Sequence, residues 1–196
     1  MCKKASAKVT ALARLLKVVP LKKKRLLFNS FVKSQFLNCP LVWMFNLSRT
    51  LNQKINRIQE RGLRIVYDDY DTSFDDLLKK DGTVRIHHRN IQLVAVVMFK
   101  VKYDLCPELM KCLFQLRPNP RDGQQHFHIP NVSSVYMGKL SLSYFGPVVW
   151  EQMLPEKYKS IETLHKFEEE IKKWVPDCKC RLCEEWVEGV GKINPV

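Results

Sequence analysis

The stretch SRTLNQKINRIQERGLRIVY, at residues 48–67, reads as one amphipathic helix with two different sides. Apolar residues and one glycine recur at the spacing of a single helical face: Leu51, Ile55, Ile58, Gly62 and Ile65. A row of positive charge lies beside that face: Lys54, Arg57, Arg61 and Arg64. The spacing predicts that the apolar row packs against the protein and that the basic row stays charged.

The sequence also indicates where this helix begins and ends. Ser48 or Thr50 can accept backbone N–H bonds at the start, and Asp68 and Asp69 end the basic row. The basic row is either a binding surface for a polyanion or a solvated flank, and the helix alone does not decide between the two.

The formal net charge of the chain is +13, and all of the excess positive charge lies in its first third. Residues 1–67 hold 15 basic side chains and one acid, Glu60, whereas residues 68–196 hold 18 basic and 19 acidic side chains. This asymmetry is typical of a surface for phosphates, because each neutralised phosphate releases a condensed counterion. A membrane surface would attract the same charge, but the narrow apolar row suits a protein core better than lipid.

A second cluster of cations stands at the start of the preceding helix, which is expected from residue 21 to about residue 35. Four adjacent cations there oppose the helix dipole unless anions come near, so this run is a second candidate phosphate contact. A nuclear-import signal and a solvated face are the alternatives. The candidate nucleic-acid-binding residues are Lys22, Lys23, Lys24, Arg25, Arg49, Lys54, Arg57, Arg61 and Arg64.

Helical spacing dominates the first 115 residues. Further helices are expected at 1–18, 74–80, 83–103 and 107–114, and the helix at 83–103 should be central because its middle is apolar nearly all round. Residues 1–115 are therefore predicted to form a basic helical bundle. Prolines and a glycine at 116–125 predict a linker.

The region at 126–196 is expected to be a small α+β unit. Alternating or β-branched residues predict strands at 126–129, 132–137 and 140–145, as a short antiparallel hairpin or a three-stranded sheet. Ser160 is expected to cap a final helix whose inward residues are Leu164, Phe167, Ile171 and Trp174. The predicted fold class is mainly α: a helical bundle, a small α+β region with a short antiparallel hairpin, and a Cys-rich tail.

That tail carries the strongest candidate metal ligands. Cys178, Cys180 and Cys183 place three thiols within six residues, and thiolates are ligands that zinc favours. A closed structural zinc site needs four ligands, and His165, a more distant cysteine or a second chain can supply the fourth. One structural zinc is expected on this interpretation, and ordinary reduced thiols on the other.

Residues 41–45 read LVWMF and are apolar enough to be core or interface. The candidate interface residues are Leu41, Trp43, Met44 and Phe45. No segment approaches the roughly 20 apolar residues that span a bilayer. No apolar signal core follows the N-terminus, so we expect an intracellular protein, cytoplasmic or nuclear, with no membrane partner.

Several blocks of the chain resemble one family in the same order. They are FVKSQFLNCPLVWMFNLSRTLNQKINRIQERGLRIVYDDYDTSFDDLLKKDG at 31–82, IHHRNIQLVAVVMFKVKYDLCPELM at 86–110, SLSYFGPVVWEQMLPEKYK at 141–159 and KKWVPDCKCRLC at 172–183. The family is the LINE-type, jockey-like non-LTR retrotransposon reverse transcriptases, in the region that follows the polymerase palm. The resemblance implies a helical thumb that closes over template and primer, RNA or DNA as partner, and a palm encoded upstream. Within such a thumb, Gly62 is expected to let a neighbouring helix approach closely.

The metal-binding aspartates of the palm would then lie before Met1, and no enzymatic activity is expected of this chain. Tyr67-Asp68-Asp69 is similar to the Tyr-x-Asp-Asp motif of reverse transcriptases, but no residue separates the tyrosine from the first aspartate. The motif also ends a basic amphipathic helix instead of joining two apolar strands. We interpret it as a polar helix stop.

Three functional hypotheses remain open. In the first, the chain is a non-catalytic fragment of a retrotransposon reverse transcriptase that binds template and primer through phosphate contacts. In the second, it is a helical protein-interaction module that docks on a polymerase palm or a host protein through residues 41–45. In the third, it is a non-functional truncated remnant, since it opens in the middle of a helical pattern.

Overall fold

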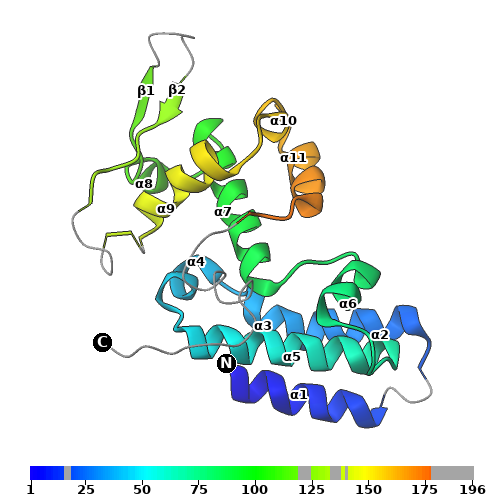
Figure 1. Cartoon of the computed structure of the whole chain (residues 1–196). Helices are drawn as coiled ribbons and strands as arrows, with labels where there is room; N and C mark the ends of the chain where they lie inside the picture. Colours follow the sequence, from blue (N-terminus) through cyan, green and yellow to red (C-terminus); the bar gives the residue numbers. More distant parts are fainter. Residues whose placement is uncertain (16–18, 119–124, 133–137, 140, 178–196) are drawn as a thin grey trace.

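The structure is a computed structural model that describes residues 1–15, 19–118, 125–132, 138–139 and 141–177. It is mainly helical with one short two-stranded antiparallel sheet, as the sequence predicts (Figure 1). The longer helices are α1 (Cys2–Leu15), α2 (Leu21–Phe28), α5 (Arg49–Tyr67), α6 (Phe74–Asp81), α7 (Ile86–Lys102), α9 (Leu142–Val148) and α11 (Leu164–Glu170). The four-residue helices are α3 (Ser34–Leu37), α4 (Pro40–Trp43), α8 (Glu108–Lys111) and α10 (Glu156–Lys159).

The first half of the chain is a bundle of three long helices. A π-helical turn at Asn29–Lys33 joins α2 to α3, so that the chain is helical from residue 21 to residue 37. Figure 1 shows α1 and α5 running in one direction and the α2–α3 unit between their ends running in the other. Phe31, within this turn, is 50% exposed, because the wider π turn changes the facing of the residues around it.

The core of this bundle also includes α6 and the first residue of α7. Its buried residues come from every helix of the bundle: Ala5, Val9, Leu12, Phe28, Val32, Phe36, Leu47, Ile55, Leu63, Val66, Phe74, Leu77, Leu78 and Ile86. Helix α6 has the expected ends. Ser73 accepts a hydrogen bond from the Asp76 amide, and Gly82 ends the helix with φ of 64°.

Helix α5 turns a partly polar face to the core. Its buried residues are Asn52, Ile55, Asn56, Gln59, Gly62, Leu63 and Val66. The predicted inward row is therefore wrong at Leu51, which is 42% exposed, and Ile58 and Ile65 are only partly buried. The apolar spacing did not predict that Gln59 is buried. Its burial is tolerated because both the nitrogen and the oxygen of its side-chain amide form hydrogen bonds, which leaves neither atom unsatisfied.

Gly62 lies directly against the ring of Phe28. A Cβ atom on Gly62 would lie 2.0 Å from Phe28 Cε2 and 2.6 Å from Phe28 Cζ. The close helix approach predicted from the sequence is thus confirmed, and its partner is α2. Phe28 is 2% exposed and packs with Val9, Leu12 and Val66, so its ring has little room to move aside.

We expect Gly62→Ala to destabilise the protein by about 1–2 kcal/mol, since overpacking costs about 1–3 kcal/mol and the helix gains up to about 1 kcal/mol from alanine. Urea unfolding followed by circular dichroism measures this difference. Phe28→Leu should recover part of the loss in the Gly62→Ala background, although it is destabilising alone. A Gly62→Ala protein as stable as wild type would show that Phe28 yields freely.

Helix α7 leaves the bundle and forms the centre of a second core (Figure 1). The ring of Phe99 on α7 lies 4.5 Å from that of Phe167 and 6.4 Å from that of Trp150, measured between centroids. Trp150 belongs to a π-helical turn at Val149–Met153, and Phe167 belongs to α11. The predicted inward residues Phe167, Ile171 and Trp174 are buried here, while Leu164 is partly buried.

The two strands lie earlier in the chain than predicted. Strand β1 (Leu116–Pro118) pairs with β2 (Gln125–Phe127), and Arg117 faces His126 across the ladder. The first strand therefore falls within the segment expected to be a linker. Of the strand predicted at 132–137, residues 133–137 lie outside the described residues.

The strand predicted at 140–145 is wrong: Leu142–Val148 is the helix α9. At Gly146, this helix approaches α7 so closely that a Cβ atom would lie 2.6 Å from Met98 Sδ. Packing on α7 thus overrides the alternation of apolar and polar residues that predicted a strand. The predicted cap is also wrong, since Ser160 follows α10 and α11 begins only after Thr163.

The two cores are not divided at 116–125. The second core combines Met44 and α7 with residues as late as Trp174, so it draws on both sides of that segment. Trp43 packs against both cores, and Ile86 of α7 belongs to the bundle core whereas Ile91 belongs to the second. Helix α7 and the segment before α5 therefore connect the two halves.

Candidate nucleic-acid interface

The outward face of α5 presents three cations. Lys54, Arg57 and Arg61 are exposed, and their i, i+3, i+7 spacing places them on the side opposite Ile55, Leu63 and the other buried residues. They span about 10 Å of the helix axis at 1.5 Å per residue. Among the described residues, no carboxylate forms an ion pair with any of the three. This group, the α5 basic row, is open to solvent along its length.

The two ends of the predicted row differ from its middle. Arg49 is exposed in the first turn of α5. Arg64 is half-buried, and its Nη2 donates to Glu60 Oε1 at 2.8 Å while its Nη1 donates to the Tyr70 carbonyl oxygen. The guanidinium of Arg64 therefore serves the end of α5 and the turn after it, and we leave it out of the α5 basic row.

The four basic residues at the start of α2 also differ from one another in exposure and in their partners. Lys22 and Lys23 are exposed and Lys24 is half-buried. Pro20 precedes the helix without a side-chain cap, and no acid lies in its first turn, so nothing in the helix offsets the repulsion between its dipole and these lysines. Arg25 instead binds Asp81, with Nε donating to Oδ1 at 2.8 Å and Nη2 donating to the carbonyl oxygen at 2.6 Å.

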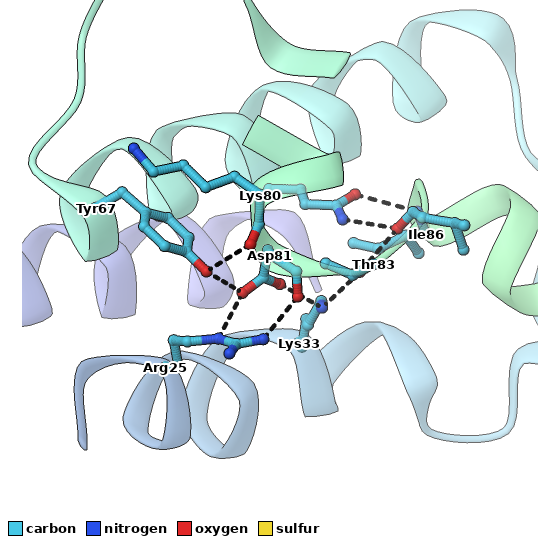
Figure 2. A network of polar contacts seen from close by, with 9 residues as sticks. Arg25, Lys33, Tyr67, Lys80, Asp81, Thr83 and Ile86 are labelled. Carbon is cyan, nitrogen blue, oxygen red and sulfur yellow. Dashed lines mark hydrogen bonds and ion pairs between the residues drawn. The ribbon is translucent and has the colours of Figure 1, made fainter. Parts of the chain in front are cut away.

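Asp81 is the centre of a polar network that fixes α2, α5 and α6 together (Figure 2). Its side chain is 4% exposed. Besides Arg25, the Tyr67 hydroxyl donates to Asp81 Oδ1 at 2.9 Å, and Lys33 Nζ lies 3.6 Å from Oδ2. One carboxylate thus holds three helices, and it sets how α5 is oriented beside α2.

Gln59 continues this attachment from the middle of α5. Its Nε2 donates to the Val84 carbonyl oxygen at 3.0 Å, and its Oε1 accepts from the Ile86 amide at 3.1 Å. Gln59 is fully buried. The inward face of α5 is therefore bonded to the α6–α7 turn, which keeps the opposite face, with its three cations, turned to solvent.

The network changes the acidity of two of its members. Burial raises the pKa of Tyr67 to about 12, helped by its hydrogen bond to Asp81 and the charge of that carboxylate. Burial lowers the pKa of Lys33, although the nearby Asp81 carboxylate opposes the change. Both directions favour the neutral form of a group withdrawn from water.

Tyr67-Asp68-Asp69 is a helix end, as predicted. Asp68 ends α5 with φ of 51°, a left-handed conformation that aspartate adopts more readily than most residues. Asp69 binds Lys80 at 2.9 Å and accepts from Thr72, and these hydrogen bonds lower the pKa of Asp69 to about 2. Tyr67 and Asp69 thus have structural roles through their side-chain hydrogen bonds, and Asp68 has one through its backbone conformation.

A scan against protein-family models finds no match to this chain, and searches of curated proteins and of solved structures find none either. Among the described residues, no helix is both long and apolar enough to cross a bilayer.

The apolar segment at 41–45 is built into the core. Met44 is 3% exposed, and Leu41, Trp43 and Phe45 are partly buried against the second core. The Trp43 indole donates to the Asn38 carbonyl oxygen at 3.1 Å. Val42, at 77% exposed, is the large side chain of this segment that faces solvent. The core alternative for this segment therefore describes it better than an exposed patch does.

The predicted metal ligands divide between described and undescribed positions. Cys178, Cys180 and Cys183 lie outside the described residues. His165 is on the exposed side of α11, and its Nδ1 is 3.9 Å from Glu169 Oε2. Within the described part of the chain, no group of three metal-binding side chains is found, so a zinc site in the tail stays a prediction.

Sequence reasoning missed Asp81 and Gln59, although both determine how the α5 basic row is presented. The sequence separates Asp81 from Arg25 by 56 residues and Gln59 from Val84 by 25. Gln59 did give one signal, since it lies on the same helical face as Ile55, Leu63 and Val66. A polar residue in the middle of a buried face indicates a specific hydrogen-bond partner.

Proposed function

We propose that this chain binds nucleic acid through phosphate contacts, as a non-catalytic helical piece of a retrotransposon reverse transcriptase. The observation that carries the proposal is the α5 basic row, Lys54, Arg57 and Arg61, exposed and without ion-pair partners among the described residues. Exposed cations on one face of a rigid helix suit a phosphate backbone, because phosphate contacts need charge and position but no base recognition.

Lys22 and Lys23 extend the proposed surface. They are exposed on α2, which packs against α5, and the helix dipole makes an anion near them favourable. The partner is RNA, DNA or a hybrid of the two, as the resemblance of residues 31–82 to a reverse-transcriptase thumb implies. The charge pattern alone implies a polyanion of any backbone.

The experiment is a binding titration of the triple variant Lys54→Ala, Arg57→Ala, Arg61→Ala. Affinity for duplexes of several sequences should fall together, and the magnitude of the slope of log affinity against log salt should decrease by roughly 2.7, since each of the three lost phosphate contacts removes about 0.9 on a duplex. Fluorescence anisotropy with labelled RNA, DNA and hybrid duplexes measures both the affinity and the slope. The titrations cover about 50 to 200 mM salt, the range over which such slopes are read.

A matched control separates local contact from loss of net charge. The triple variant Lys139→Ala, Lys157→Ala, Lys166→Ala removes the same charge from exposed positions in the second half of the chain. It should leave affinity and slope close to wild type. If both triple variants behave alike, or if the α5 variant binds as wild type does, the α5 basic row is not the nucleic-acid interface.

A further inference from the structure

A cavity of about 260 Å³ lies where the two halves of the chain meet. Its walls come from the end of the α2–α3 unit, the α6–α7 turn, the start of α7 and the 3₁₀ turn at Ile171–Lys173. Three of its lining residues are cations, Lys33, Arg89 and Lys172, and none of the described residues that line it is acidic. Segments far apart in the sequence thus bring three positive charges to one cavity.

Two of the three cations, Lys33 and Arg89, are held at the cavity by side-chain hydrogen bonds. Lys33 Nζ donates to the Thr83 hydroxyl at 2.9 Å, and the carboxylate near it, Asp81, already binds Arg25 (Figure 2). Arg89 Nη1 donates to Gln92 Oε1 at 2.8 Å. Positive charge therefore exceeds negative charge at this site.

Gln92 connects the remaining wall to α7. It is 1% exposed, and its Nε2 donates to the Trp174 carbonyl oxygen. The same side-chain amide therefore orients Arg89 and anchors the chain just after Lys172. This arrangement fixes two cations from different segments with respect to each other, as a preorganised binding site requires.

Burial makes the charges of Lys33 and Arg89 costly, and nearby carboxylates offset only part of that cost. Withdrawal from water lowers the pKa of Lys33 and also the pKa of Arg89, against the opposing effect of Glu168 on the arginine. Glu168 itself pairs with Lys100 at 3.6 Å. The cavity also lies at the N-terminal end of α7, a 17-residue helix whose dipole adds positive potential there.

We propose that this cavity binds a phosphate group, held by Arg89, Lys172 and Lys33. An arginine guanidinium and two ammonium groups suit the charge and the oxygen atoms of phosphate. The group comes either as inorganic phosphate or as the phosphate of a mononucleotide. The site is separate from the α5 basic row, so it does not rest on the function proposed above.

The test is calorimetric titration of the full chain with inorganic phosphate, with a nucleoside monophosphate and with the unphosphorylated nucleoside, all at one ionic strength set with chloride. Phosphate should bind saturably and the nucleoside should not bind. Tighter binding of the monophosphate than of inorganic phosphate identifies a nucleotide as the ligand, and equal binding identifies the free ion.

Variants assign the binding to the cavity. Lys172→Gln and Arg89→Gln should each weaken phosphate binding about tenfold or more, because each removes a charged donor. Lys172 is exposed, so its variant should fold normally even if Arg89→Gln does not. Lys166→Gln, an exposed lysine away from the cavity, and the triple α5 variant should bind phosphate as wild type does.

Absence of saturable phosphate binding at constant ionic strength overturns the proposal, and so does wild-type affinity in the Lys172→Gln variant. Loss of phosphate binding in the triple α5 variant would also overturn it, since it would place the phosphate on the nucleic-acid surface. Failure of nucleic-acid binding with phosphate binding retained would reject only the function proposed above.

Discussion

Replacing Asp81 with asparagine should destabilise the protein by roughly 3 kcal/mol, because removal of one partner from a buried ion pair leaves the other charge uncompensated. The affected cations are Lys33, whose side chain is 16% exposed, and Arg25, whose side chain is 44% exposed. Lys33 should account for most of the loss, since the more exposed Arg25 can be solvated by water. Urea unfolding at neutral pH measures the difference.

The same substitution at Asp75 is a matched control on the same helix. Asp75 pairs with Arg85 at 2.6 Å, but its side chain is 58% exposed, so Asp75→Asn should change stability by less than about 1 kcal/mol. Equal losses in the two variants would show that Asp81 has no special position in the fold.

The pH dependence gives the Asp81 prediction a second readout. The pKa of Lys33 lies below its ordinary value of 10.5, so its protonated form opposes folding, and this effect fades as the pH rises toward 10.5. The pKa of Lys33 should fall further in Asp81→Asn, because the carboxylate that favours its protonated form is gone. The stability deficit of the variant should therefore shrink between about pH 8 and pH 10, a range in which lysine begins to lose its proton.

The pH dependence of stability that Tyr67 contributes has the opposite sign to that of Lys33. The pKa of Tyr67 is raised to about 12 in the folded protein, so its contribution to stability is present below its ordinary pKa of 10.0 and is lost as the pH rises through about 12. Asp81→Asn removes the carboxylate that helps to raise it. The tyrosinate absorbance assigned to Tyr67, by difference from Tyr67→Phe, should therefore titrate at a lower pH in the variant.

Replacing Trp150 with alanine should destabilise the protein by about 3–5 kcal/mol, the range for removing a large buried aromatic side chain. Trp150 is 2% exposed, and its ring lies 6.1 Å from that of Phe127 and 6.0 Å from that of Phe167, measured between centroids. The loss would open a cavity where β2, α7 and α11 meet. Urea unfolding gives the free energy of unfolding.

Two further variants check the cause. Trp150→Phe keeps an aromatic ring at the site and should lose less than half as much stability as Trp150→Ala. Val42→Ala, at a side chain that is 77% exposed, should remain within about 0.5 kcal/mol of wild type. A loss below about 1 kcal/mol for Trp150→Ala would mean that the second core does not depend on this aromatic cluster.

Short-range sequence patterns predicted the long helices of the first half and the residues at which they end. Ser48 caps α5 and Asp68 ends it, while Ser73 and Gly82 do the same for α6, because these side chains act within one turn of the helix end. The same local information failed at residues 140–145. There the alternation of apolar and polar residues predicts a strand, but the choice depended on a surface of α7 about 45 residues away.

The sequence predicted which basic residues lie at the candidate interface. It did not predict which of them are already engaged by other groups of the protein. The spacing of Lys54, Arg57 and Arg61 gives one helical face, yet the same pattern includes Arg64, which Glu60 and Tyr70 engage. Arg25 is likewise indistinguishable from Lys22 in the sequence. Its ion pair with Asp81 exists only because the fold brings α2 beside α6.

The sequence by itself determined the amphipathic helix at 48–67 and the concentration of positive charge before residue 68, because each depends on residues that are near one another in the chain. Only the tertiary structure decided which of those charges face solvent, that α7 belongs to two cores, and that Lys33, Arg89 and Lys172 share a cavity. These features depend on contacts between distant segments, which hydrophobic periodicity and local charge do not encode.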